Sequence, residues 1–165
     1  MKNLLIIGIT LLQAIGFSQS ESTGIEIYLV NKSHPDLYNE QIGELDCYYC
    51  FEPAKSDLFD KPLIEKNDIE KFDWNEQKII LSKRGTEKLN ELHIPLRGLA
   101  VALVLNNEPI YGFWFWTLES SFGCDYVYTY PKKNFKIKYG LPKNFARGND
   151  PRFDKRIATY LSKNN

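Results

Sequence analysis

The feature that most constrains the fold is a pair of apolar segments joined by turn-forming residues. Residues 99–105 read LAVALVL, residues 106–109 read NNEP, and residues 110–117 read IYGFWFWT. Two apolar runs around such a turn predict a β-hairpin. Neither run alternates between apolar and polar positions, which is typical of strands covered on both faces. We therefore expect this hairpin in the middle of a sheet that is packed on both sides.

The aromatic residues of the returning strand leave two interpretations. Strand alternation places Gly112, Trp114 and Trp116 on one face of this strand and Tyr111 on the other. A packed aromatic ring buries about 150–250 Å², whereas an exposed stripe of this size promotes aggregation unless a ligand covers it. We expect a core strand. The alternative is a partly exposed platform with a ligand beside Gly112. Its binding residues would be Tyr111, Phe113, Trp114, Phe115, Trp116, Ser120 and Ser121.

The remaining patterns predict further strands and two helices. Alternating or β-branched segments predict strands at 26–30, 46–51, 78–81, 126–130 and 134–139. Ser82 is expected to cap a helix over 83–92, and Pro151 to open a C-terminal helix. Residues 67–72 are expected to form one helical turn. The prediction is a single α+β domain over 21–165, mainly an antiparallel sheet packed by one or two helices.

Residues 1–20 have the pattern of a secretory signal peptide. Lys2 is followed by an apolar run over 4–17 and then by small polar residues. The run is short for a membrane span, so we expect cleavage; an uncleaved anchor is the alternative. The mature protein would begin at Gln19 or Glu21 and would be periplasmic or secreted, with no membrane span.

The charge balance argues against a polyanionic partner. Lys plus Arg and Asp plus Glu each number 21, so no net field favours nucleic acid or anionic lipid. The densest basic run, KKNFKIK at 132–138, alternates between polar and apolar positions. That alternation is typical of a strand with one solvated face. We therefore expect no nucleic-acid partner.

Three cysteines, Cys47, Cys50 and Cys124, predict one disulfide and one free thiol in an exported chain. The CYYC motif has the spacing of a thioredoxin-type redox pair, but no helix start follows it to lower a thiol pKa. On a strand, Cys47 and Cys50 would point to opposite faces, and the aromatic residues between them disfavour a tight turn. We expect a structural Cys50–Cys124 disulfide and a buried thiol at Cys47. The alternatives are a Cys47–Cys124 bond, a redox-active Cys47–Cys50 pair, a metal site and an intermolecular disulfide.

No motif of a catalytic or cofactor site is recognisable. His34 and His93 have no close partner at the spacing of metal ligands. Ser120 and Ser121 lack the strand–elbow–helix context of a serine nucleophile. Capping and salt bridges explain the charged residues of the last helix. We predict no catalytic residues, no metal and no cofactor, which favours a protein that is not an enzyme.

Part of the chain resembles the periplasmic head subdomain of the SecD protein-export component. The matching pieces are Asp68-Ile69, the segments 78–81 and 82–92, and the hairpin that reaches Tyr111. The chain departs from that pattern because it has no transmembrane helices and carries Asn-Asn in place of the usual acidic-Gly turn. The resemblance implies a similar order of elements, and translocase function does not carry over.

A larger part resembles a group of small exported bacterial proteins of no established function. The segments that carry this resemblance are PLIEKNDIEKFDW, LNNEPIYGFWFWTLESS and the terminal DPRFDKRI. The resemblance implies a shared fold and compartment, and it supplies no catalytic residues.

These patterns favour an exported, non-catalytic domain that binds a protein or envelope partner through a sheet edge or the aromatic face. One alternative is a periplasmic thiol-active or hydrolytic enzyme that uses Cys47, Cys50 or residues 120–125. The other is an inhibitor or immunity-type protein directed against a secreted enzyme.

Overall fold

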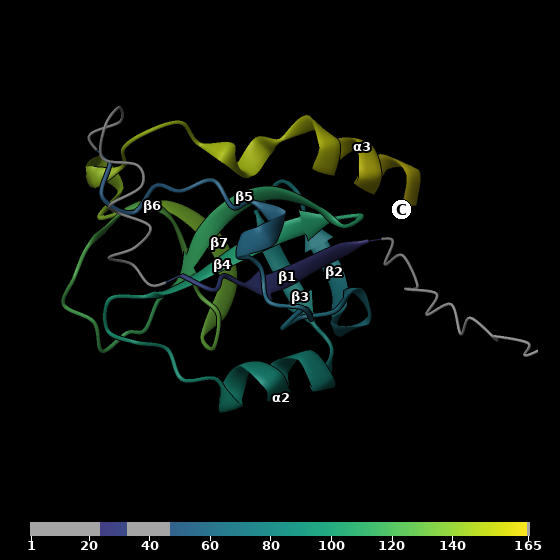
Figure 1. Cartoon of the computed structure of the whole chain (residues 1–165), viewed down its shortest axis with the longest axis horizontal. Helices are drawn as coiled ribbons and strands as arrows, with labels where there is room; N and C mark the ends of the chain where they lie inside the picture. The colour runs from purple at the N-terminus through teal and green to yellow at the C-terminus, as the bar shows by residue number, and fades with distance from the viewer. Residues whose placement is uncertain (1–23, 33–46, 165) are drawn as a thin grey trace, which may run out of the picture.

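Seven strands form one mixed sheet in the order β1-β4-β5-β6-β7-β3-β2 (Figure 1). The structure, a computed structural model, describes residues 24–32 and 47–164. The strands are β1 (Ile25–Leu29), β2 (Ile69–Asp73), β3 (Lys78–Leu81), β4 (Leu99–Leu105), β5 (Glu108–Phe115), β6 (Cys124–Tyr130) and β7 (Asn134–Leu141). The helices are α2 (Lys83–Glu91) and α3 (Lys155–Asn164), with the short 3-10 helices η1 (Lys55–Asp57), η2 (Lys66–Asp68), η3 (Lys143–Phe145) and η4 (Pro151–Phe153). The predicted α+β fold, with a mainly antiparallel sheet and a C-terminal helix, is confirmed.

The central hairpin, β4–β5, has the predicted position, but its turn is two residues long, because β5 begins at Glu108 within the predicted turn 106–109. Leu105 pairs with Glu108, and the intervening Asn106 and Asn107 have φ angles of 51° and 64°. A type I′ turn requires positive φ at both central residues, and asparagine adopts this conformation more readily than most residues. The turn chemistry therefore supports the register of the strands that run through the core.

β5 and β6 form the one parallel pair among the described strands. Trp114 pairs with Tyr128, and the backbone N–H of Trp116 donates to the carbonyl of Thr129. A tight hairpin cannot join two parallel strands, so residues 116–123 form a longer connection. This connection places surface residues next to the core tryptophans.

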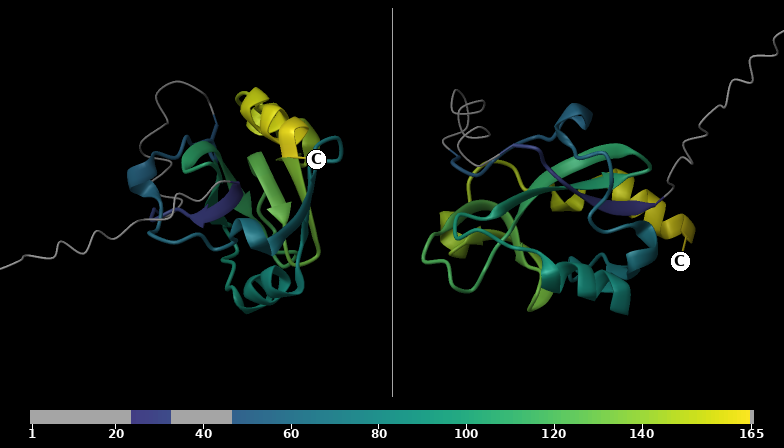
Figure 2. Two further views of the ribbon diagram at one scale, coloured as in Figure 1. Left: turned by 90° about the vertical axis from the view of Figure 1, so that its right-hand side faces the viewer. Right: turned by 60° about the horizontal axis from the view of Figure 1, so that its bottom comes forward.

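The helices α2 and α3 lie on opposite sides of the strands (Figures 1 and 2). As predicted, Ser82 caps α2, because its side-chain oxygen accepts a hydrogen bond from the N–H of Gly85. The inward side chain of Leu89 is buried. The C-terminal segment differs from the prediction: Asp150 caps the short helix η4, and α3 begins only at Lys155.

Two other predicted elements also differ from the structure. Residues 47–50 form a turn rather than part of a strand, and residue 46 lies outside the described residues. The predicted helical turn over 67–72 is divided, because η2 ends at Asp68 and β2 begins at Ile69. Pairing of β2 with β3 therefore outweighs the local capping signal that favoured a helix.

The predicted signal peptide also lies outside the described residues, so its cleavage stays a prediction. Within the described part of the chain, no helix is long and apolar enough to cross a membrane.

The aromatic strand β5 lies in the core, as expected from the sequence. Trp114 and Trp116 are each 1% exposed. The ring of Tyr49 contacts both tryptophans edge to face, with ring centroids 5.2 Å apart in each case. Trp114 Nε1 also donates a hydrogen bond of 2.7 Å to the carbonyl oxygen of Tyr49. The segment that contains Tyr49 therefore covers the tryptophan face of the strand.

The space beside Gly112, where the platform alternative places a ligand, is filled by a protein side chain. The ring of Phe51 lies so close to Gly112 that a Cβ at this position would overlap it. Phe51 also packs edge to face on Trp114, at a centroid distance of 5.5 Å. The platform alternative is therefore wrong for this strand.

Candidate functional site

The predicted binding residues divide into buried and surface groups. Ser120 is half-buried and Ser121 is exposed, both in the connection between β5 and β6. The other predicted residues do not reach the surface, because β5 and the residue after it are packed on both faces. These buried residues are Tyr111, Phe113, Trp114, Phe115 and Trp116. The predicted aromatic binding face is thus corrected, and only the two serines lie where a partner can contact them.

Large apolar side chains are exposed at the end of the molecule that is formed by connecting loops. Leu96 precedes β4, Leu118 and Phe122 belong to the connection between β5 and β6, and Phe145 is the last residue of η3. Leu118 is 61% exposed, the largest value among the exposed large apolar residues. We call these four residues the loop-end patch.

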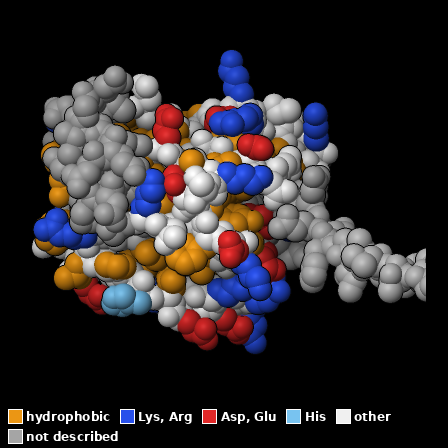
Figure 3. All heavy atoms as spheres, in the orientation of Figure 1, with side chains coloured by type: hydrophobic (Ala, Val, Ile, Leu, Met, Phe, Trp, Pro, Cys, Tyr) orange, Lys and Arg blue, Asp and Glu red, His pale blue; other side chains and the backbone are white. Residues whose placement is uncertain are grey.

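Short contacts hold the loops of the patch together. Ser120 Oγ donates a hydrogen bond of 2.6 Å to the carbonyl oxygen of Leu96 and accepts one from the N–H of Phe122. A Cβ at Gly123 would lie 3.5 Å from the ring of Phe145. Hydrophobic side chains gather over the lower left of the surface in Figure 3. These contacts tie together the loops that carry Leu96, Phe122 and Phe145.

The loop before β4 lies tightly against the core tryptophans. Gly98 has a φ angle of +86°, and a Cβ there would lie 2.5 Å from the ring of Trp116 and 3.1 Å from Trp114. Glycine alone combines this backbone conformation with so close an approach. The exposed side chain of Leu96 therefore stands on a loop that is anchored directly on the core.

Two cations lie beside the aromatic members of the loop-end patch, in a chain that has no net charge. The guanidinium of Arg97 lies 4.5 Å from the ring centroid of Phe122, and that of Arg147 lies 5.7 Å from the ring centroid of Phe145. Neither arginine forms an ion pair with a carboxylate among residues 24–32 and 47–164. Both arginines are exposed and lie over aromatic members of the patch, so its rim includes two cations.

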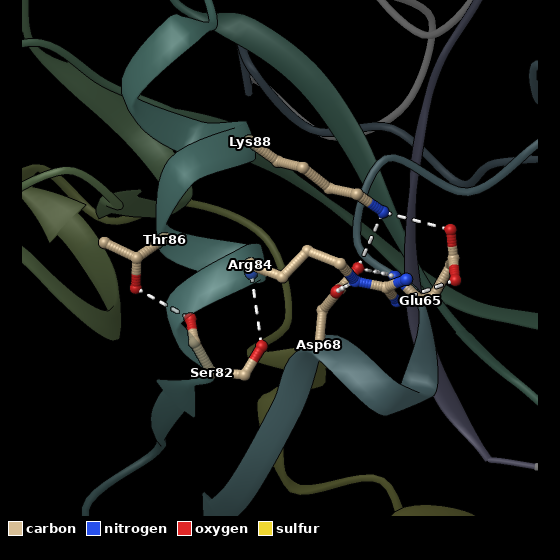
Figure 4. A network of polar contacts seen from close by, with 7 residues as sticks. Glu65, Asp68, Ser82, Arg84, Thr86 and Lys88 are labelled. Carbon is tan, nitrogen blue, oxygen red and sulfur yellow. Dashed lines mark hydrogen bonds and ion pairs between the residues drawn. The ribbon is translucent and has the colours of Figure 1, made fainter.

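A separate cluster of charged side chains joins η2 to α2 (Figure 4). It consists of Glu65, Asp68, Arg84 and Lys88. Asp68 has no exposed surface and accepts from Arg84 Nε at 2.6 Å and from Lys88 Nζ at 2.8 Å. Glu65 accepts from the same two cations, at 2.9 and 3.0 Å. Two acids and two bases neutralise each other here, so the cluster attaches a helix to the sheet and offers no unpaired charge to a ligand.

The electrostatics of this cluster favour the charged forms of its members. Burial raises the pKa of the Asp68 carboxyl, but hydrogen bonds from Lys88, from the N–H of Glu65 and from Arg84 outweigh it, so the net pKa is lowered. The hydrogen bond from Lys88 is the main cause that lowers the pKa of Glu65. The cluster is therefore fully ionised at neutral pH.

The disulfide joins Cys47 to Cys50, with 5.5 Å between their Cα atoms, and Cys124 is a buried free thiol. The predicted Cys50–Cys124 bond is wrong. The reason is the turn at 47–50, where the N–H groups of Tyr48 and Tyr49 donate to the carboxylate of Asp125 at 2.6 and 2.9 Å. The carboxylate of Asp125, from a distant part of the sequence, thus stabilises a tight turn that Tyr48 and Tyr49 by themselves disfavour.

The environment of the thiols is poor for nucleophilic chemistry. Both disulfide sulfurs belong to buried residues, and a Cβ at Gly148 would lie 2.8 Å from Cys50 Sγ. Cys47 Sγ lies 3.6 Å from Asp125 Oδ1, and a carboxylate disfavours a neighbouring thiolate. Burial raises the pKa of the Cys124 thiol, so this thiol is protonated at neutral pH.

No protein-family model, curated protein or solved structure matches the chain. The two resemblances noted from sequence patterns therefore stay predictions.

The described residues contain no group of three His, Cys, Asp or Glu side chains placed to hold a metal ion. The loop-end patch was not predicted from the sequence, although Ser120 and Ser121 lie within its loops. Its apolar members come from segments up to 49 positions apart (Leu96 and Phe145) and have no shared local pattern. The sequence signal for this patch was the group of Leu, Phe and Gly residues around the two serines, and that pattern is equally typical of an ordinary loop.

Proposed function

We propose that the chain is an exported, non-catalytic domain that binds a protein partner in the cell envelope through the loop-end patch. The observation that carries this proposal is the gathering of four exposed, large apolar side chains on loops that are tied together by hydrogen bonds. Isolated exposed apolar residues are ordinary, but a contiguous group with a polar rim is typical of a protein interface.

The charges around the patch indicate what kind of partner surface fits it. Arg97 and Arg147 stack on the aromatic members of the patch, and arginine is enriched at binding interfaces. A complementary partner has an apolar centre surrounded by acidic side chains. Rim charges of this kind mainly increase the association rate, and salt screens them.

The compartment follows from the predicted signal peptide and is compatible with the disulfide, since such bonds persist in oxidising compartments. The pattern resemblance to small exported proteins also supports it. An inhibitor or immunity-type role would be one form of the same proposal, in which the partner is a secreted enzyme.

Site-specific photo-crosslinking tests the patch in the producing cell. With a photoreactive residue at position 118 or 122, we expect a covalent adduct with one envelope protein. The same probe at Ile80, which is also exposed but lies on β3 beside Lys71, is expected to give none.

The crosslinked protein is then purified and titrated with the intact domain. Leu118→Glu is expected to weaken binding by at least about tenfold, and Ile80→Glu to leave it unchanged. Equal effects of the two variants, or equal adducts from both positions, would reject the patch as the interface.

A second candidate function is thiol–disulfide exchange, which the Cys47–Cys50 pairing favours because two cysteines separated by two residues are the usual redox arrangement. No helix starts at this turn, and both cysteines are buried. We therefore expect a structural disulfide, with a reduction potential below about −300 mV in glutathione or dithiothreitol buffers. Mass mapping should find Cys124 alkylated only after unfolding. A potential near that of protein disulfide isomerase, about −180 mV, would instead favour the redox enzyme.

A further inference from the structure

A pocket of about 400 Å³ lies between the segment that follows α2, the connection 116–123 and the turn between β6 and β7. Its volume is within the range of about 300–1,000 Å³ that is common for small-molecule sites. The apolar part of its wall comes from Leu92, Ile94, Trp116, Leu118 and Tyr130. The pocket adjoins the loop-end patch through Leu118 but is a separate, concave site.

The charged residues at the pocket favour an anion. Lys132 Nζ donates to the carbonyl oxygen of Asn90 at 2.9 Å, which fixes its ammonium group and leaves two further N–H donors. Lys133 has no ion pair with any residue that the structure describes. The acidic residue of the wall, Glu119, accepts a hydrogen bond from Thr117 within its own turn. The pocket wall therefore carries two lysines and one carboxylate, and His93 adds no negative charge.

The wall also contains a polar group that the fold leaves unsatisfied. Trp116 lines the pocket, its side chain is 1% exposed, and its indole Nε1–H has no acceptor among the described residues. A buried donor without an acceptor costs free energy. A ligand with a second polar oxygen at the indole edge would satisfy this donor, whereas an unbranched carboxylate bound at the lysines would contact only the indole ring.

We infer that this pocket binds a small amphipathic anion, with an apolar chain or ring against Trp116 and Tyr130 and a carboxylate between Lys132 and Lys133. The apolar wall selects the body of the ligand, and the two ammonium groups select its charge. This site goes beyond the proposed function, because it requires no protein partner.

A length-matched series tests the charge preference on the purified, full domain. Octanoate, octanol and octylamine are titrated by calorimetry, with the amide chemical shifts of Tyr130, Lys132 and Lys133 as the positional readout. Octanoate is expected to bind at least roughly tenfold more tightly than octylamine, and to shift the signals of the β6–β7 turn. Octylamine binding as tightly as octanoate, or no binding of octanoate, would overturn the inference.

Two charge reversals locate the site. Lys133→Glu is expected to weaken octanoate binding by roughly tenfold and to leave octanol binding unchanged. The matched control, Lys155→Glu, changes a second groove between the β4–β5 turn and α3. An effect of Lys155→Glu with none of Lys133→Glu would place the ligand in that groove instead and reject the pocket. Both lysines are exposed, so neither variant should fail to fold.

Discussion

Replacing Trp114 by alanine is expected to lower the free energy of unfolding by about 3–5 kcal/mol, as for other large-to-small changes in cores. The indole is 1% exposed, packs against Tyr49 and Phe51, and donates to the carbonyl of Tyr49. Its removal leaves a cavity and takes away the hydrogen bond that the indole donates to the carbonyl oxygen of Tyr49. Urea unfolding monitored by far-ultraviolet circular dichroism measures the change.

Trp114→Phe separates the two contributions. Phenylalanine keeps an aromatic ring in the site but loses the N–H, so this variant should recover part of the loss and retain a cost of about 1–2 kcal/mol for the missing hydrogen bond. Trp74→Ala is the matched control, because Trp74 is only partly buried and should cost much less than Trp114→Ala. Equal stabilities of the Trp114 and Trp74 alanine variants would contradict the core position of β5.

The second large effect concerns the cluster that attaches α2. Asp68→Ala is expected to cost about 3 kcal/mol, at the lower end for breaking a buried ion pair. Asp68 is fully buried, but its partners Arg84 and Lys88 keep 55% and 30% of their side chains exposed, so water can partly replace the lost carboxylate. Thermal and urea unfolding at neutral pH measure this cost, and Glu87→Ala on the exposed face of α2 is the control, with an expected change near zero.

The same cluster sets an acid dependence whose sign is fixed by the lowered pKa values of Asp68 and Glu65. Carboxyls with lowered pKa in the folded state stabilise it fully above their unfolded pKa of about 4, and this contribution is lost as the pH falls through the folded pKa. The wild-type protein should therefore lose stability steeply below about pH 4. Asp68→Asn should lose less over the same range, and an identical pH profile for both proteins would refute the assignment.

The sequence by itself determined the elements whose signals are local. Two apolar runs around Asn106 and Asn107 specified the central hairpin, because the turn conformation and the strand pattern involve neighbouring residues only. Ser82 specified the start of α2 for the same reason, since a helix cap bonds to an N–H three residues away.

Tertiary structure alone decided which cysteines pair and where the candidate binding surface lies. The turn that allows the Cys47–Cys50 bond is held by Asp125, which is 76 positions from Tyr49 in the sequence. The loop-end patch likewise depends on contacts between distant residues, because the pairing of Leu99 with Phe115 and the hydrogen bond from Ser120 to Leu96 bring the connection 116–123 beside the loop that precedes β4. Contacts between distant residues leave no periodic or turn signal in the chain, so they are set by packing of the whole sheet and cannot be derived from any one segment.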